Sequence, residues 1–441
     1  MANTYISRTQ ANGTSAKKFT VSIWFKRSPV TNVGNQPLWS SSSSTGDAVD
    51  LLLQGNGEIV FEDVNANAPK FVTSRKLRDC SAWYHLVVAV DSTQGVAANR
   101  VKIYLNGVQE TAFGTATLPN QNMDFAISTT ADTMKFGSGG QYTSNYFNGV
   151  MTHVHFIDGL QYAASYFGST DSATGQWTIN TGPSVTYGTN GCFLLKDGIT
   201  ITDSSSNSNN FSLSQGTLTK TQDCPSNNFA TLNPLNAYFT NSTFSNGNTT
   251  FASGSSYSGT VGNILVDTGK WYWEVKVISK TGDGDNYSIG IQGHDATATN
   301  QFPGDQASGW MYYGAGNYYT GGSGTGTGTV YNAGDIIGVA LDLINNKIYW
   351  SKNGTFIMSG NPVTGANSVA ITAPASVPLG GYYPSTTFWS GSSGTFSMNF
   401  GNGYFGTTAV SSAGTNASSN GIFEYAVPSG YTALSTKGLN L

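Results

Sequence analysis

Period-two alternation of apolar and polar residues recurs along this chain of 441 residues, whereas helical periodicity is nearly absent. In residues 19–26 the odd positions are apolar, with Trp24 as the exception on the polar face. Residues 101–105 alternate in the same way, and Asn106-Gly107 then supplies the residues that a tight hairpin turn prefers. Successive side chains of a strand point to opposite faces, so each such segment has one buried face. The pattern predicts an all-β fold.

The second half of the chain restarts this pattern. Its predicted strands are 271–277, 336–343, 347–350 and 395–400. Short strands separated by Gly, Asn and Ser turns predict β-sandwiches or jelly rolls. One parallel joins the halves, because 86–91 followed by 101–107 has the same pattern as 337–342 followed by 348–354. Each is a buried strand ending in Asp, then a strand closing on Asn-Gly. Any sandwich hairpin could look like this, or the halves could be two modules of one superfold.

The composition limits the possible partners. Charged residues make up only 10% of the chain and the net charge is −4, so a protein that neutralises phosphates with Lys and Arg is not expected. No apolar stretch is long enough to predict insertion into a membrane. Three cysteines form no Cys-x-x-Cys motif, so free buried thiols are expected, with one disulfide as the alternative.

We expect two modules joined by a linker. The predicted boundaries are 1–215 for the first module, 216–235 for the linker and 236–441 for the second module. The linker is placed on the polar, proline-containing stretch around residues 220–228.

The first module resembles a concanavalin A-like, laminin-G-type jelly roll, on residues 19–28, 83–91 and 101–107. The second resembles a SPRY domain, on residues 269–275, 334–343, 349–354 and 396–401. With the joining segments 203–211 and 223–235, the whole chain is similar to tail-fibre-like and other virion surface proteins of tailed bacteriophages. This resemblance implies a non-enzymatic fibre or adhesin in the virion, assembled in the host cytoplasm. It also implies contact with other virion proteins and with host-surface glycan or envelope protein, and a homo-oligomer, with a trimer expected.

Two other functions stay open at this point. One is a capsid decoration or connecting fibre without a receptor, and the other is a polysaccharide depolymerase. A retaining or inverting glycanase needs two carboxylates about 5–9.5 Å apart. Glu58 lies near Glu62 and Asp63, but a solvated strand edge explains this group better. Glu274 beside Lys276 is interpreted as an ion pair on an outer face. No catalytic residues are predicted.

An aromatic segment around residues 310–319 is the candidate ligand site. SPRY domains, by the resemblance, bind partners with loops at one end of the sandwich. Aromatic rings suit sugar faces and protein interfaces alike. The alternative is that half of the rings fill the core and the rest support a hairpin. The candidate ligand-binding residues are Trp310, Tyr312, Tyr313, Tyr318, Tyr319 and Trp389.

Two places in the sequence have residues that could bind a metal, and no cofactor is predicted. His153 and His155 lie two apart on a predicted strand, on one face with Met151 and Ile157. Three such pairs around a three-fold axis could bind a metal, but two imidazoles alone are too few. Two histidines with hydrogen-bond partners are the alternative. In residues 281–286 the acidic spacing could suit Ca²⁺, and turn chemistry explains it equally well.

Overall fold

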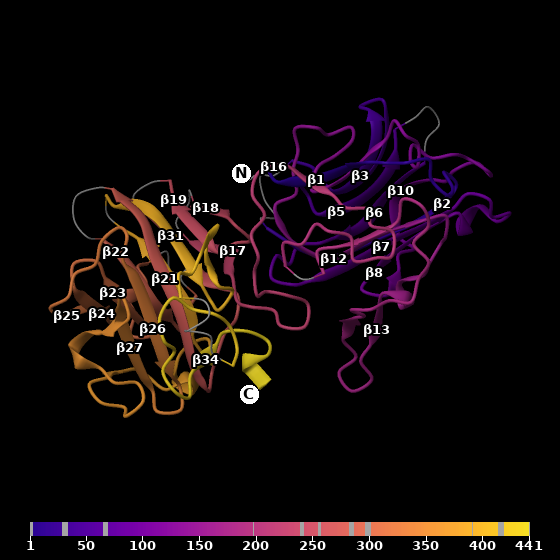
Figure 1. Cartoon of the computed structure of the whole chain (residues 1–441). Coiled ribbons are helices and arrows are strands. Elements are labelled where there is room, and N and C mark those ends of the chain that lie inside the picture. The colour runs from indigo at the N-terminus through magenta and orange to yellow at the C-terminus, as the bar shows by residue number, and fades with distance from the viewer. Residues whose placement is uncertain are drawn as a thin grey trace. The chain divides into compact units, whose positions relative to one another are not determined.

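The computed structural model describes residues 3–28, 34–64, 69–196, 198–238, 242–254, 257–281, 286–295, 301–389, 391–412 and 419–440. Within these ranges every helical segment is a single 3₁₀ turn, and the remaining regular structure is β-strand. The chain forms two compact units, Met1–Lys220 and Thr221–Leu441 (Figure 1). The all-β prediction is therefore confirmed.

The first unit is a sandwich of an eight-stranded and a six-stranded antiparallel sheet. In spatial order the larger sheet has β10 (Phe113–Thr117), β6 (Lys70–Lys76), β5 (Glu58–Asp63), β4 (Asp47–Leu53), β3 (Gln36–Ser44), β11 (Thr133–Phe136), β1 (Tyr5–Thr9) and β16 (Ser212–Gln215). The smaller sheet has β15 (Cys192–Leu194), β12 (Gly149–Asp158), β2 (Lys18–Arg27), β7 (Tyr84–Asp91), β8 (Val101–Leu105) and β9 (Val108–Gln109). The predicted alternation places Phe19, Val21, Ile23 and Phe25 in the core between the sheets.

A small hairpin explains why Trp24 interrupts the alternation of its strand. Strands β13 (Gly168–Thr170) and β14 (Trp177–Ile179) cover the outer face of the six-stranded sheet, preceded by the 3₁₀ turn η2 (Ala164–Tyr166). His85 stacks on Trp24 at 4.7 Å between ring centroids and on Trp177 at 5.9 Å. An apolar ring is therefore favourable on this face, because residues 162–187 shield it from water.

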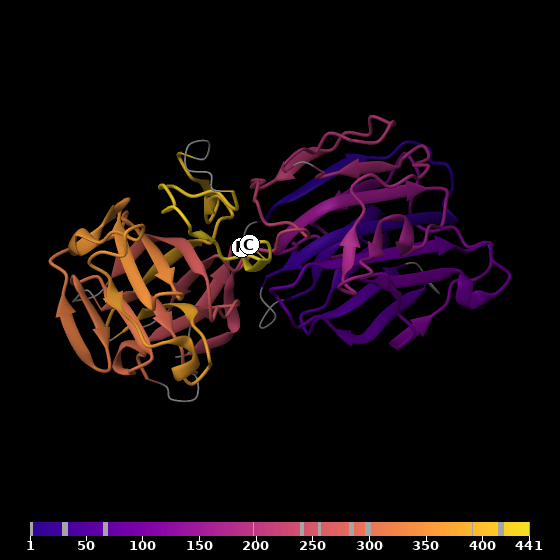
Figure 2. The ribbon, with the colours of Figure 1, turned by 90° about the horizontal axis from the view of Figure 1, so that it is seen from below.

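The second unit is also a sandwich, with its layers visible in Figures 1 and 2. One sheet has β17 (Leu232–Tyr238), β20 (Ser258–Gly262), β30 (Tyr383–Phe388), β22 (Tyr287–Gln292), β23 (Gly309–Tyr313), β24 (Asn317–Thr320) and β25 (Ser323–Gly326). The other has β18 (Ser242–Ser245), β19 (Thr250–Ser253), β31 (Ser393–Asn399), β21 (Lys270–Thr281), β26 (Ile336–Asp342), β27 (Lys347–Lys352) and β28 (Thr355–Phe356), with β29 (Val369–Ala370) and β34 (Thr432–Ala433) beside β27 and β21. A further pair is β32 (Tyr404–Phe405) with β33 (Thr408–Ala409). The 3₁₀ turns of the two units, besides η2, are η1 (Ala97–Asn99), η3 (Pro303–Asp305), η4 (Ile357–Ser359), η5 (Pro374–Ser376) and η6 (Gly438–Asn440).

The C-terminal segment covers the outer face of the sheet that contains β21. Phe423, Tyr431 and Ala433 pack with Tyr272 in a buried cluster, and β34 pairs in parallel with β21. Glu274 is fully buried beneath this segment and accepts hydrogen bonds from the backbone N–H groups of Glu424 and Tyr425 at 2.9 and 2.8 Å. The predicted ion pair with Lys276 is therefore wrong in its premise, because Glu274 lies on a covered face, while the Lys276 ammonium lies over the Phe405 ring.

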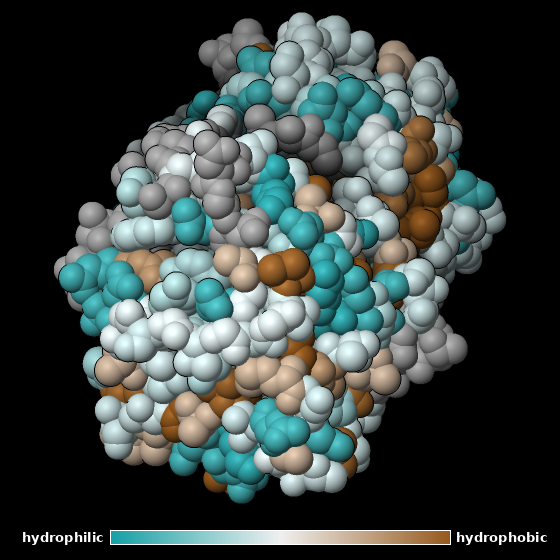
Figure 3. Space-filling view, turned by 90° about the vertical axis from the view of Figure 1, so that its left-hand side faces the viewer, coloured by the Kyte–Doolittle hydropathy of each residue, from teal (hydrophilic) through white to brown (hydrophobic). Residues whose placement is uncertain are grey.

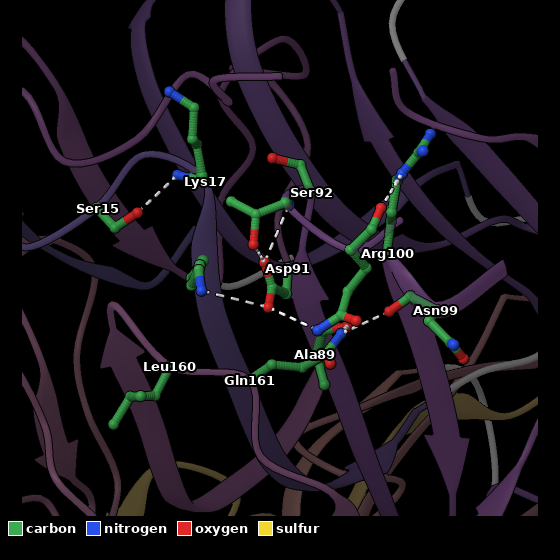
Figure 4. A network of polar contacts seen from close by, with 12 residues as sticks. Ser15, Lys17, Ala89, Asp91, Ser92, Asn99, Arg100, Leu160 and Gln161 are labelled. Carbon is green, nitrogen blue, oxygen red and sulfur yellow. Dashed lines mark hydrogen bonds and ion pairs between the residues drawn. The ribbon is translucent and has the colours of Figure 1, made fainter. Parts of the chain in front are cut away.

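The predicted parallel between the halves extends to hydrogen bonds and register. In the first unit Lys18 lies opposite Asp91 and their charged groups are 3.5 Å apart; in the second Lys270 lies opposite Asp342 at 3.0 Å. Each aspartate also accepts hydrogen bonds within the turn that follows it. Figure 4 shows the network around Asp91.

The far ends of these hairpins match as well. Asn106 and Asn353 both have positive φ, 47° and 48°, and their side-chain oxygens accept backbone N–H groups at 2.8 Å. In both units the strands before and after the shared hairpin also follow the same spatial order, β12-β2-β7-β8 and β31-β21-β26-β27. These shared features favour the interpretation of two modules of one superfold.

The predicted linker contains the division between the units and part of the second unit. The division falls between Lys220 and Thr221. Further along, Phe229 forms a β-bridge with Ser435, and the Ala230 N–H donates to Leu434 O at 2.9 Å. All three cysteines are free, with Cys80 and Cys192 buried. Among the described residues, no helix has the length and hydropathy needed to cross a membrane.

Candidate ligand-binding site

Strand β23 divides the predicted aromatic residues between two faces. Trp310 and Tyr312 point into the core between the sheets, at 4% and 0% exposure. Tyr312 also donates its hydroxyl to Thr329 O at 2.6 Å, and burial raises its pKa to about 12. Tyr318 packs against the same core and stacks on Trp350, with 6.0 Å between centroids. These three rings belong to the core of the sandwich or pack against it, and they do not contribute to the candidate site.

The other predicted residues meet on the outer face of the same sheet. Tyr313, Tyr319 and Trp389 pack with Phe302 and Met311. Consecutive ring centroids are 4.5 Å apart for Tyr319–Tyr313, 5.0 Å for Tyr313–Phe302 and 5.6 Å for Phe302–Trp389. We call these rings, together with Tyr257, the outer aromatic cluster.

Tyr257 extends the cluster into solvent. Its ring meets Trp389 edge-on at 4.8 Å and 84°, and 43% of the residue is exposed. Phe302 and Tyr313 in the middle are buried, at 1% and 9% exposure, whereas Trp389 and Tyr319 are half-buried. Edge-to-face pairs are a favoured arrangement of aromatic rings. The cluster therefore has a fixed, buried base and partly exposed rings at its ends.

Glycines and a hairpin hold Tyr319 in place. A Cβ on Gly324 would lie 2.7 Å from Tyr319 Cζ, and one on Gly304 would lie 2.9 Å from Tyr319 Cβ. The two turn residues of the β24–β25 hairpin, Gly321 and Gly322, donate their N–H groups to Gln306 O and Gly304 O, both at 3.0 Å. The ring position is thus set by close backbone approach, which only glycine permits at these points.

Sequence reasoning missed Phe302 and Tyr257. Both rings lie outside the regular strands: Phe302 precedes the 310–319 segment by a few residues, and Tyr257 lies more than 50 positions before it and meets the cluster only through the fold. No alternation or turn motif in 301–308 indicates that Phe302 is buried.

His155 is buried within the first unit. Its Nδ1 lies 3.0 Å from the Tyr187 hydroxyl, its ring stacks on Phe193 at 4.1 Å, and burial lowers its pKa. A β-bulge at Thr152–His155, with His153 at φ 46°, shifts the alternation of β12. The prediction that Met151 shares the face of His155 and Ile157 is therefore wrong, because Met151 packs on the core.

The metal predictions gain no further ligand from the structure. The described ranges contain no group of three or more His, Cys, Asp or Glu side chains that could hold a metal ion. Most of the candidate Ca²⁺ loop at 281–286 lies outside the described residues.

The candidate carboxylates Glu58, Glu62 and Asp63 of the first unit are each engaged by a lysine or a backbone N–H group. Glu58 pairs with Lys76 at 3.4 Å, and Glu62 pairs with Lys70 at 2.6 Å. Asp63 accepts the Ala126 N–H at 3.2 Å.

The structure also places Asp50 directly across from Glu62, which the sequence analysis did not predict. Asp50 accepts the N–H groups of Gly140 and Gln141 at 2.7 and 3.0 Å, and Tyr142 donates to Glu62 at 2.9 Å. Burial raises the pKa of Asp50. These hydrogen bonds hold residues 140–142 against Asp50 and Glu62. The two carboxylates therefore have a structural role.

The fold defines the class of this protein as one built from two β-sandwich domains. Residues 1–161 match the model of the concanavalin A-like lectin/glucanases superfamily, and residues 270–402 match the SPRY domain model. The chain therefore contains an N-terminal concanavalin A-like domain and a C-terminal SPRY domain.

Among curated proteins, the chain is 38% identical to Ran-binding protein 9 of Danio rerio over 88 residues, 20% of this chain and 14% of that protein. It is 36% identical to Ran-binding protein 10 of Danio rerio over 20% of this chain and 14% of that protein, and to human Ran-binding protein 9 over 20% and 12%. The matches thus span a small part of each relative.

Among solved structures, the SPRY domain of human HERC1 aligns with 19% identity and a TM-score of 0.30, over 38% of this chain and 96% of that chain. The stonustoxin structure aligns with 13% identity and a TM-score of 0.29, over 57% and 33%.

Proposed function

We propose that this chain is a non-enzymatic recognition protein of a tailed-bacteriophage virion, a fibre or adhesin that contacts a host-surface glycan or protein. The outer aromatic cluster is the observation that supports binding most directly. Half-buried Trp389 packs against the buried ring of Phe302, and exposed Tyr257 packs edge-on against Trp389, so the exposed end of the cluster is supported by packing within the protein. Rigid aromatic anchors lose little conformational entropy on binding.

Two further facts favour recognition over catalysis. The carboxylates of the first unit that could form a glycanase pair are each engaged by lysine, tyrosine or backbone donors. The curated relatives of the SPRY domain are named as Ran-binding proteins. With charged residues at 10% of the chain, we expect binding that depends little on salt.

The binding test compares Trp389→Ala with Tyr166→Ala. Tyr166 is an exposed aromatic residue of the first unit, at 45%, and serves as the matched control. Binding of purified chain to host cells should weaken about fivefold or more for Trp389→Ala, because truncating an aromatic anchor typically costs more than about 1 kcal/mol. Equal binding by both variants would contradict a role for the cluster. Periodate treatment of the cells removes a glycan ligand, and protease treatment removes a protein ligand.

The virion assignment has its own test. Quantitative mass spectrometry of purified particles gives the copies of this chain per major capsid protein. Low copy numbers in multiples of three or six would support a tail fibre and the expected trimer. Hundreds of copies would favour the capsid decoration, and absence from particles would refute the virion role.

A further inference from the structure

The geometry points to a self-pairing edge: we propose that strand β25 pairs antiparallel with β25 of a second copy of this chain. Strand β25 (Ser323–Gly326) is the last strand of its sheet, and all four of its residues are exposed. This proposal does not depend on the ligand of the outer aromatic cluster.

The turn of the hairpin fixes which backbone groups face outward. Gly321 and Gly322 have φ 54° and 73°, and Thr320 lies opposite Ser323. A two-residue turn with both φ values positive closes on a hydrogen-bonded pair, and pairs then alternate along the strands. Thr327 continues this alternation, because its N–H donates to Gly316 O at 2.8 Å. Residues 323, 325 and 327 therefore bond inward, and the N–H and C=O groups of Gly324 and Gly326 point away from β24.

These outward groups are complementary to themselves. A two-fold axis at Thr325 places Gly324 of one copy opposite Gly326 of the other, on both sides of the axis. Opposed residues of a hydrogen-bonded pair exchange two bonds, so all four outward N–H groups find partners. Thr325 then faces its own equivalent, a favourable cross-strand pair without like charges.

The edge also lacks the features that usually prevent such pairing. Edge strands are commonly guarded by charges, proline or β-bulges. The exposed edges β10 and β16 of the first unit each pair through an irregular register, and β17 contains Pro234 and a register shift. By contrast, β25 pairs in regular register throughout and contains only Ser, Gly and Thr.

The surrounding surface favours a contact made by backbone hydrogen bonds. Strand β25 lies at the left-hand border of the second unit in Figure 1, and this side faces the viewer in Figure 3. There, strongly hydrophobic residues form small separate patches among polar ones (Figure 3). Backbone pairing along a short edge predicts a weak, concentration-dependent dimer.

The test compares Gly326→Pro with Gly326→Ala in the full chain. Proline removes the outward N–H, and its ring obstructs an incoming strand, while the inward bonds of Thr325 and Thr327 are kept. Alanine keeps the N–H and fits, since its Cβ would meet only Asn317 Oδ1, at 3.4 Å. In sedimentation velocity over a concentration series, wild type and Gly326→Ala should dimerise. Gly326→Pro should raise the dissociation constant at least about tenfold, because two interchain hydrogen bonds are lost.

A second variant keeps the proposal testable if Gly326→Pro does not fold. Thr325→Lys places two ammonium groups opposite each other across the axis, so its dimer should weaken at low salt and recover at high salt; Thr325→Ser is its control. A wild type that stays monomeric at every concentration would overturn the proposal. So would dimers that Gly326→Pro leaves unchanged, or a trimer that is insensitive to both variants.

Discussion

Replacing Glu274 by glutamine tests how the C-terminal segment is held on the SPRY domain. The carboxylate is fully buried and accepts four hydrogen bonds: from the Glu424 and Tyr425 N–H groups, from Asn399 Nδ2 at 3.1 Å and from the Tyr272 hydroxyl at 3.2 Å. Glutamine has nearly the same shape, but it turns one acceptor oxygen into a donor. Two of the four donors are then left without an acceptor.

The expected cost depends on pH. Each buried donor left unsatisfied costs about 1–3 kcal/mol. The neutral acid already carries a hydrogen on one oxygen but keeps a lone pair there, so relative to neutral Glu274 the Glu274→Gln substitution should leave at least one donor unsatisfied and destabilise the second unit by about 1–3 kcal/mol. Burial outweighs the four donors and raises the pKa of Glu274 from 4.5 to about 7. The folded state therefore binds this proton more tightly than the unfolded state does. The resulting stability is present below pH 4.5 and is lost as the pH rises to about 7.

Between pH 5 and pH 8 this loss should amount to about 2.5 kcal/mol for the wild type, from the pKa values of 4.5 and about 7. Glu274→Gln cannot undergo it, so the cost of the substitution should shrink by about 2.5 kcal/mol at the higher pH. Comparing the two proteins cancels the titration of other groups, such as His294. The buried imidazole of His294 has a lowered pKa and acts in the opposite direction.

The full chain is titrated with urea at both pH values, and hydrogen exchange is measured in peptides from β21 and from residues 419–433. These measurements give the free energy of unfolding of the second unit. Peptides from the first unit are the internal control. Equal costs of the substitution at pH 5 and pH 8 would refute the buried-carboxylate argument. A cost near zero at pH 5 would refute the hydrogen-bond argument.

Two further predictions concern the first unit. Trp177 Nε1 donates to His85 Nδ1 at 2.9 Å, so His85 should be the Nε2–H tautomer, and burial lowers its pKa to about 3. Its imidazole should stay neutral at pH 4.5 in nitrogen-15 NMR spectra, and the first unit should lose stability as the pH falls below 6.5; a shift in the spectra near pH 6 would contradict this. Gly107→Ala should destabilise more than Gly175→Ala in thermal unfolding. Both have positive φ, 80° and 71°, but a Cβ on Gly107 would lie 2.4 Å from Trp177 Cε3, whereas Gly175 has open space. We expect about 1–2 kcal/mol for Gly175→Ala and about 1–3 kcal/mol more for Gly107→Ala, and equal losses would refute the clash.

The sequence predicts features that depend on neighbouring residues and fails where distant segments decide. Alternation predicted which face of β2 is buried in the core. For the 310–319 segment, the alternative interpretation that half of the rings fill the core agrees with the structure, in which Trp310 and Tyr312 are in the core and Tyr313 is on the outer face. One extra residue in β12 shifts the alternation, so Met151 faces the core. No residue type in that strand predicts this bulge. Glu274 looked exposed because its own strand alternates. Residues 423–433, about 150 positions away, cover it.

The hairpins shared by the two units show why much of the fold of this protein can be predicted from local sequence patterns. Asp at the start of the loop and Asn-Gly at the end of the second strand are local signals for the turns that bound each hairpin, whereas the lysine that pairs with the aspartate comes from the neighbouring strand, more than 70 positions earlier in the chain. The covering segments have no such repeated signal: residues 168–179 cover the first unit, and 419–440 cover the second. The part of the sheet that each covering segment leaves exposed therefore differs between the two units. The shared hairpins therefore account for the common scaffold, and the covering segments and the loops, including those that carry Phe302 and Trp389, account for the structural differences between the two domains.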